Sequence, residues 1–145
     1  MMEGVIVSPL KVIDVEGGDV LHAMKSFDGG YEGFGEAYFS TIKSGIVKGW
    51  KRHKDMTLNL IVPKGNIRFV LFDSRDDSMT KNQYFEVNLS LENYNRLTVP
   101  PMIWMGFQGL EEGLSLLLNI ASIPHSKLEE EHKELDEIYF DWSCN

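Results

Sequence analysis

The chain lacks the features expected of a membrane protein, a disulfide-rich secreted protein or a nucleic-acid-binding protein. It has one cysteine, Cys144, so no disulfide can form within it, which is typical of a protein from the reducing cytoplasm. No run of eighteen apolar residues is present, and the start, MMEGVIVSPLKV, does not have the pattern of a secretory signal. Lys and Arg number 14 against 22 Asp and Glu, so the net charge is -8, which argues against binding to nucleic acid. We therefore expect a cytoplasmic protein with neither a membrane nor a nucleic acid as partner.

What the chain does contain is enough apolar sequence for one folded unit. Of its 145 residues 43% are hydrophobic, and no repeat, low-complexity tract or linker interrupts them, so we predict a single domain over 1–145. Apolar and polar residues alternate with a period of two, and turns rich in glycine or proline separate the alternating segments. The predicted strands are 4–15, 36–42, 46–51, 56–62, 66–73, 82–89, 96–99, 104–108 and 114–121, and 20–24 is predicted to be a short strand or an extended piece. This series predicts an all-β fold of two packed antiparallel sheets, a sandwich or barrel.

The sequence makes more specific structural predictions for two segments. Residues 114–118 are nearly all apolar, which predicts that they lie deep between the two sheets. Ser126 and Glu129 have the spacing of a capping box, and the residues that follow favour helix. We therefore predict a short surface helix or helical turn over 126–136, whose run of charges forms a solvated face.

The most informative stretch is 45–53, Gly-Ile-Val-Lys-Gly-Trp-Lys-Arg-His. Its basic side chains stand out from the acidic background and could gather at the mouth of a barrel, where an anionic ligand binds. Along a strand, residues 51 and 53 share one face, and 50 and 52 share the other. We therefore expect Lys51 and His53 to point inward with Trp50 and Arg52 outward, or the reverse if Gly49 introduces a bulge.

This stretch resembles the Gly-x-x-Arg-Gly-Leu-His strand of the dTDP-4-dehydrorhamnose 3,5-epimerase family, small cupin enzymes of nucleotide-sugar metabolism. Residues 65–75 resemble the family's Gly-x-Val-x-Asp-Val-x-Val-Asp-x-Arg hairpin, with Asp73 and Arg75 in place. Residues 85–107 and the closing Leu-Asp-Glu-Ile-Tyr-Phe-Asp-Trp also match, so the resemblance covers roughly 36–142 in order. It implies a cupin jelly roll, a nucleotide-linked deoxysugar as ligand, and a homodimer paired through N-terminal strands.

The resemblance also implies roles, several of which fall on different residue types. The family uses a histidine base beside a 4-keto group, a tyrosine on the opposite face, a lysine near the ketone and phosphate-binding arginines. Lys48 stands at an arginine position and Lys51 at the position of the base. Leu58, Met105 and Leu118 stand at or near the family's lysine, a second histidine and the tyrosine. Return of a proton would then use the same face, water, or another residue such as Tyr38 or His125.

A second resemblance, to sugar 3,4-ketoisomerases of the same superfamily, concerns their Arg-Gly-x-His-x-His-Lys segment. Here the chain reads Lys-Gly-Trp-Lys-Arg-His-Lys over 48–54, so His53 matches the second histidine and Lys51 replaces the first. Lys51 and His53 are accordingly the candidate catalytic residues. The candidate substrate-binding residues are Lys48, Trp50, Arg52, Asn59, Arg75, Trp104 and Asn119.

Each candidate also has a structural alternative. Trp50 and Trp104 suit a core or a dimer interface, and Asn119 suits a buried structural hydrogen bond. His53 suits either a surface position or an ordinary structural hydrogen bond. A metal is not expected, because His53 lacks the partner of a His-x-His pair and Met105 removes the distal ligand. No organic cofactor is expected either.

Two functions follow from this sequence. The first is an epimerase or isomerase of a dTDP-4-keto-6-deoxyhexose-type nucleotide sugar, acting next to the ketone through Lys51 or His53, in cell-surface polysaccharide or deoxysugar biosynthesis. The alternative is a catalytically inactive cupin that binds a sugar nucleotide, a carbohydrate or a partner biosynthetic enzyme. An enzyme should hold Lys51 or His53 inside a partly apolar cavity with converging polar groups, whereas a binding protein could present them on a flat surface.

Overall fold

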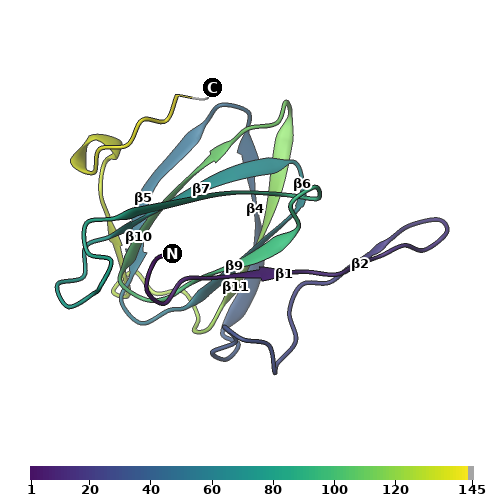
Figure 1. The fold of residues 1–145 in the computed structure, drawn as a ribbon, viewed down its shortest axis with the longest axis horizontal. Helices are drawn as coiled ribbons and strands as arrows, with labels where there is room; N and C mark the ends of the chain where they lie inside the picture. Colours follow the sequence, from purple (N-terminus) through teal and green to yellow (C-terminus); the bar gives the residue numbers. More distant parts are fainter. Residues whose placement is uncertain (144–145) are drawn as a thin grey trace.

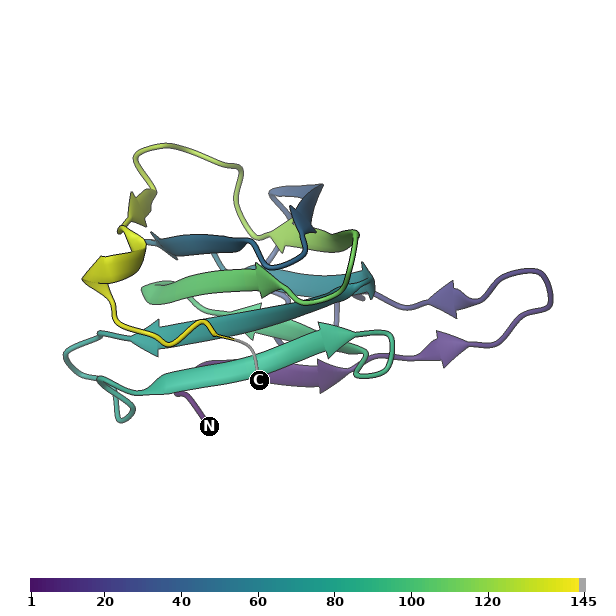
Figure 2. The same ribbon diagram turned by 90° about the horizontal axis from the view of Figure 1, so that it is seen from above.

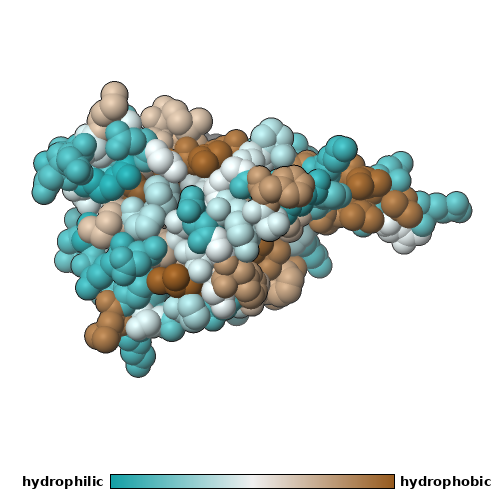
Figure 3. Space-filling model, turned by 90° about the horizontal axis from the view of Figure 1, so that it is seen from below, coloured by the Kyte–Doolittle hydropathy of each residue, from teal (hydrophilic) through white to brown (hydrophobic). Residues whose placement is uncertain are grey.

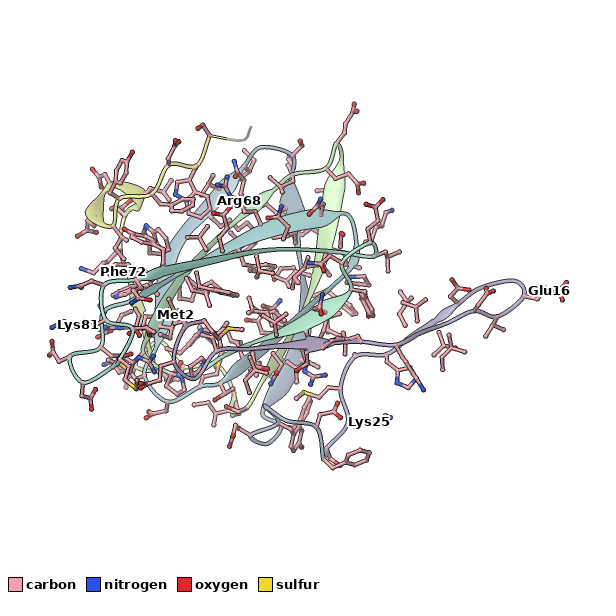
Figure 4. All side chains as sticks on the ribbon, in the orientation of Figure 1. Met2, Glu16, Lys25, Arg68, Phe72 and Lys81 are labelled. Atoms are coloured by element: carbon pink, nitrogen blue, oxygen red, sulfur yellow. The ribbon has the colours of Figure 1, made fainter. Side chains whose placement is uncertain are left out.

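The computed structural model describes residues 1–143, and in this part of the chain the strands form two five-stranded antiparallel sheets and one two-stranded hairpin (Figures 1 and 2). The strands are β1 (Ile6–Pro9), β2 (Val12–Ile13), β3 (Val20–Leu21), β4 (Glu36–Lys43), β5 (Val47–His53), β6 (Leu58–Lys64), β7 (Asn66–Asp73), β8 (Tyr84–Ser90), β9 (Asn95–Val99), β10 (Ile103–Gly109), β11 (Leu114–Ala121) and β12 (Glu130–His132). The first sheet has the order β1-β9-β6-β11-β4, and the second has the order β12-β5-β10-β7-β8. Strands β2 and β3 form an arm that projects from the sheets, with Glu16 at its tip (Figure 4).

The main core lies between the two sheets, where every second side chain of the central strands points inward. Leu60 and Val62 of β6 face Ile67 and Phe69 of β7 in this layer, and all four are fully buried. Burying one such side chain contributes roughly 1.5–3 kcal/mol. The period-two pattern of the sequence is therefore the pattern of this core, which confirms the prediction of two packed antiparallel sheets.

A second apolar layer covers the outer face of the second sheet. Trp50, Val70 and Trp104 point away from the main core and are buried together with Ile138 of the C-terminal segment. Phe140 and Trp142 follow Ile138 and pack on the same cluster, and the Trp142 ring lies 5.7 Å from the Trp50 ring. Alternate residues of β5 and β10 thus serve two different layers.

Several predicted segments differ from the structure. The strand expected over 4–15 is divided into β1 and β2, because the chain leaves the first sheet after Pro9 and enters the arm. In 114–118 only Ser115 and Leu117 are buried, and Leu114 is exposed, so the expectation that the whole segment lies between the sheets was wrong. Strand β11 buries one face only, because the other face of the first sheet is its outer surface.

The helical segment expected over 126–136 is reduced to a 3-10 turn at Leu135–Glu137. Residues 130–132 form β12 instead, because their backbone pairs with β5 and so forms hydrogen bonds that a helix would not allow. None of the helical structure in residues 1–143 has the length and hydrophobicity needed to cross a lipid bilayer.

Candidate functional site

A cavity of about 220 Å³ enters the sandwich beside β4 and β5, and its two walls come from different sheets. The first sheet contributes Tyr38, Ser40, Leu58 and Asn119, and the second contributes Lys48, Gly49, Lys51, His53, Met105 and Phe107. Pockets for drug-sized ligands usually measure about 300–1,000 Å³, so this one suits a group such as a sugar ring. Hollows of about 290 and 490 Å³ lie elsewhere, against outward-facing Arg96 and Thr98 of β9.

A bulge in β5 explains why three basic residues line one wall. Met105 of β10 pairs with Lys51 and Phe107 pairs with Lys48, so three steps along β5 oppose two steps along β10. Strict alternation would put Lys48 and Lys51 on opposite faces, and the extra residue at Gly49–Trp50 puts both on the inner face. Lys51 and His53 point inward, as the first of the two expected arrangements has them. The expectation that a bulge at Gly49 would reverse them was wrong, because the extra residue lies before Lys51 and changes only the face of Lys48.

His53 is held by a buried carboxylate. Its side chain is about one tenth exposed, and its Nδ1 lies 2.6 Å from Oε1 of Glu129. The other oxygen, Oε2, accepts the backbone N–H groups of Asp55 and Met56, each at 2.9 Å. Burial by itself would raise the pKa of Glu129, but these backbone N–H groups and His53 hold it below its usual value. Because the ionised carboxylate accepts the Nδ1–H, Nε2 of His53 is left as a potential proton acceptor.

Lys51 lies beside a second carboxylate, that of Glu130, which follows Glu129 in the chain. Its Nζ is 3.6 Å from Oε2 of Glu130, whose side chain is only 10% exposed. His132 Nε2 lies 3.2 Å from the other oxygen, Oε1, and His125 Nδ1 lies 3.6 Å from Oε2. Burial alone would raise the pKa of Glu130, but the hydrogen bond to His132 and the nearby charges of Lys51 and the two histidines lower it. The carboxylate thus offsets the charge of the Lys51 ammonium.

Tyr38 stands on the other wall, at the edge strand of the first sheet. Burial raises the pKa of its phenol, and the negative charges of Glu36 and Glu130 raise it further, so the phenol stays protonated at neutral pH. Asn119, opposite Tyr38 in the register, donates from Nδ2 to Ser40 Oγ at 3.0 Å and to the Tyr38 carbonyl at 3.3 Å. Asn119 therefore lines the cavity and also fixes the strand that carries Tyr38.

Three other predicted substrate contacts, Trp50, Arg52 and Trp104, lie on the outer face of the second sheet. The Trp50 Nε1–H donates to the Ile138 carbonyl at 3.2 Å. The Arg52 guanidinium lies 4.6 Å from the centre of the Trp104 ring and also pairs with Glu131. The structure does not bring these side chains to the cavity, and it places the two tryptophans in the second apolar layer.

Asn59 and Arg75 are also engaged elsewhere. Asn59 Nδ2 donates to the Gly30 carbonyl at 2.9 Å, and its Oδ1 accepts from Thr98 at 2.6 Å, on the outer side of the first sheet. Arg75 binds both oxygens of fully buried Asp73 at 2.9 Å. Burial opposes ionisation of Asp73, but hydrogen bonds led by Arg75 hold its pKa far below the usual range. Both residues organise loops and lie outside the cavity.

The glutamates that contact the basic residues of β5 are visible in the sequence as a charge run. Residues 129–131 are three consecutive glutamates, expected to form part of a solvated face. They lie instead along the basic residues of β5, where Glu129 binds His53, Glu130 pairs with Lys51 and Glu131 pairs with Arg52. Complementary charge runs of equal length indicate strand pairing of this kind.

Comparison with known proteins agrees with this geometry. The family model for dTDP-4-dehydrorhamnose 3,5-epimerase matches residues 22–143. The chain belongs to this family. A solved structure of a dTDP sugar isomerase from Desulfovibrio desulfuricans G20 is 39% identical, with a TM-score of 0.94 over 97% of this chain and 92% of that one.

Two curated relatives belong to glycan biosynthesis by name. A probable low-salt glycan biosynthesis epimerase of Haloferax volcanii is 30% identical over 84 residues, 57% of this chain, and the match spans about half of that relative, 54%. A spore coat polysaccharide biosynthesis protein of Bacillus subtilis is 23% identical over 147 residues, which cover 99% of this chain and 97% of that one. The family resemblance seen in the sequence is thereby confirmed.

Proposed function

We propose that the protein is an epimerase or isomerase of a dTDP-linked 4-keto sugar, which moves a proton at a carbon next to the ketone. The observation that carries this proposal is the arrangement of the cavity: His53, bound to Glu129, lies on one wall, and Tyr38, a protonated phenol, lies on the other. The names of the relatives support a dTDP sugar as substrate and a role in cell-surface glycan biosynthesis. The lone cysteine supports a cytoplasmic location.

In the proposed mechanism, Nε2 of His53 removes the proton from the carbon beside the carbonyl group. The electrons of the broken C–H bond form the C=C bond of an enolate, and the carbonyl electrons move to its oxygen. The Lys51 ammonium stabilises that oxygen, since a fixed positive group near developing charge lowers the barrier. The Tyr38 O–H then delivers a proton to carbon from the opposite wall, which re-forms the C=O bond and inverts the configuration. His53 loses its proton to water, and the Tyr38 phenolate takes one proton from water, so both groups return to their starting states.

Lys48 is proposed to bind the diphosphate. Its Nζ is exposed at the mouth of the cavity, where it donates to the Thr41 carbonyl at 2.9 Å and lies 5.8 Å from the Phe107 ring. A point charge held there suits a phosphate outside the cavity, while the sugar ring enters it. The nucleotide is then left on the surface beyond Lys48.

The alternative function is a binding protein without catalysis. The specific observation in its favour is that Leu58 and Met105 make part of the cavity apolar, at positions where the family resemblance implies a lysine and a histidine. In that case Lys48 and Lys51 would hold the ligand, and His53 and Glu129 would only join β5 to the C-terminal segment.

The test is solvent deuterium exchange into a dTDP-4-keto-6-deoxyhexose, followed by NMR. We expect the protein to exchange a proton next to the ketone, because proton removal precedes both epimerisation and isomerisation. Tyr38→Phe is expected to retain exchange and lose epimerised product by about 10²–10⁴-fold, since it removes only the acid. Tyr139→Phe, at an exposed position outside the cavity, is the matched control. Ligand binding without any exchange would favour the binding protein.

We further propose that the protein is a homodimer joined through the arm. Val12, Ile13, Val15 and Val20 are each more than 40% exposed, and Figure 3 shows apolar surface along the arm. Strand β1, from which the arm extends, is also an unprotected edge of the first sheet. A second copy would cover these side chains, and a stable interface buries above about 1,000 Å² in total.

Light scattering at micromolar concentration is expected to give the mass of a dimer. Ile13→Asp should shift the protein to monomer, because a charge would be buried without a partner in the interface. Glu16→Gln at the exposed tip of the arm is the control and should leave the mass unchanged. A monomer in the unaltered protein would contradict the proposal.

A further inference from the structure

One carboxylate oxygen of Glu130, a residue with no role in the proposed proton transfer, is buried without a hydrogen-bond partner in the described part of the chain. The side chain is nine-tenths buried, and the oxygen concerned is Oε2. Lys51 Nζ and His125 Nδ1 each lie 3.6 Å from this oxygen, close enough for charge attraction and too far for a hydrogen bond. A buried acceptor without a donor is costly, so such an atom indicates a place where a further group binds.

This oxygen lies next to the cavity, behind Lys51, and Glu130 itself is not one of the lining residues. Glu130 pairs with His53 across β12 and β5, so the two residues share the inner face. Lys51, beside Oε2, lines the cavity, and the charge of Glu130 acts on Tyr38 of the opposite wall. The carboxylate is also oriented, because its other oxygen is held by His132 at 3.2 Å.

The chemistry around Oε2 selects the kind of group that fits. Oε2 requires a donor, whereas the Lys51 ammonium offers donors and His125 offers one when Nδ1 carries its proton. A phosphate or a ketone only accepts hydrogen bonds and would be repelled by the carboxylate. An ammonium group only donates, so it could bind Oε2 but could not accept from Lys51 or His125. An alcohol hydroxyl both donates and accepts, and its oxygen can lie about 2.8 Å from each of two atoms that are 3.6 Å apart.

A metal ion is a poorer fit to the same residues. His125, Glu130 and His132 are ligand types, but no group of three His, Cys, Asp or Glu side chains in the described part of the chain is arranged to hold a metal ion. The Lys51 ammonium next to Oε2 also opposes a cation there. The surroundings of Oε2 therefore favour a neutral hydroxyl.

We propose that Glu130, together with Lys51 and His125, binds a hydroxyl of the sugar and selects substrates that carry one on the carbon next to the ketone. This rests on the proposed function, in which Lys51 faces the ketone oxygen, so a hydroxyl that shares Lys51 sits on the neighbouring carbon. Glu130 accepts the hydroxyl proton, and Lys51 or His125 donates to the hydroxyl oxygen. Glu130 is thus a specificity residue and takes no part in the proton transfer itself.

The experiment is calorimetric titration with dTDP-glucose, its 3-deoxy analogue and its 2-deoxy analogue, which carry no ketone and do not react. The unaltered protein is expected to bind the 3-deoxy sugar about ten- to a hundredfold more weakly than dTDP-glucose, as for loss of a hydrogen bond to a charged group. Glu130→Leu should bind dTDP-glucose and the 3-deoxy sugar equally. The 2-deoxy sugar should bind like dTDP-glucose in both proteins.

Two further variants keep the proposal falsifiable if Glu130→Leu does not fold. His125→Ala alters a half-exposed loop side chain and should reduce the discrimination, whereas Glu131→Gln, on the outer face, should preserve it. Equal binding of dTDP-glucose and the 3-deoxy sugar by the unaltered protein overturns the proposal, even where deuterium exchange upholds the proposed function. Discrimination that survives in Glu130→Leu overturns it too. Failure to bind any of the three sugars overturns this proposal and the assignment of the ligand together.

Discussion

His53→Gln is expected to reduce deuterium exchange into a dTDP-4-keto sugar by about 10²–10⁴-fold, because glutamine fills a similar space and cannot accept the proton. Glu129→Gln should reduce exchange less, since the base remains and loses only the carboxylate that orients it. The initial rate of deuterium incorporation, followed by NMR at saturating sugar nucleotide, measures both effects. Calorimetric binding of dTDP-glucose should change little in His53→Gln.

Lys51→Met separates the second candidate base from the first. If Lys51 stabilises the enolate, its loss slows exchange, and His53 still removes the proton in the residual reaction. Lys54→Gln, an exposed lysine next to His53, serves as the control and should exchange at the original rate. Loss of exchange in Lys51→Met combined with full exchange in His53→Gln would make Lys51 the base. Full exchange in both variants would remove both residues from the chemistry.

Trp50→Ala is expected to lower the free energy of unfolding by about 3–5 kcal/mol. The indole is 1% exposed, packs against Trp142, and donates its N–H to the Ile138 carbonyl, so its removal loosens the whole C-terminal segment. Trp50→Phe keeps most of the packing and should cost about 1–3 kcal/mol, mainly through the unpaired carbonyl. Urea unfolding followed by circular dichroism gives these values.

The control for this series is Phe39→Ala. Phe39 is 64% exposed on the outer face of the first sheet, so its removal should change stability by only about 0.5 kcal/mol in the monomer. Trp50 was also a candidate platform for the sugar. If Trp50→Phe leaves the free energy of unfolding unchanged and weakens binding of dTDP-glucose tenfold, Trp50 acts as a sugar platform. Such a result would contradict its role in packing the C-terminal segment.

Much of the fold could be predicted because period-two patterning is a local property of the chain. Strands β4 to β11 lie close to their predicted ranges, since each strand buries alternate residues and is bounded by its own turns. The same rule separated inward-facing Lys51 and His53 from outward-facing Trp50 and Arg52. Family resemblance added the jelly-roll topology, which no local pattern specifies.

The prediction was less successful where contacts with distant segments of the chain decide the local structure. Helix propensity over 126–136 is a weak preference, and pairing with β5 together with three charge contacts outweighs it. Leu114 lies on a strand whose outer face has no sheet above it, which a run of apolar residues does not reveal. Such outcomes depend on what lies next to a segment and not on its own composition.

Local patterning was enough to predict which faces of each strand are apolar and where the basic residues gather, and motif order was enough to identify the family resemblance. Which of those residues contact one another depends on the three-dimensional fold. The β5 bulge turned Lys48 inward, β12 brought Glu129 and Glu130 to His53 and Lys51, and the opposing sheet placed Tyr38 across the cavity. His53 and Glu129 are 76 residues apart in the chain, and their contact depends on strand order and register, which local patterning leaves open.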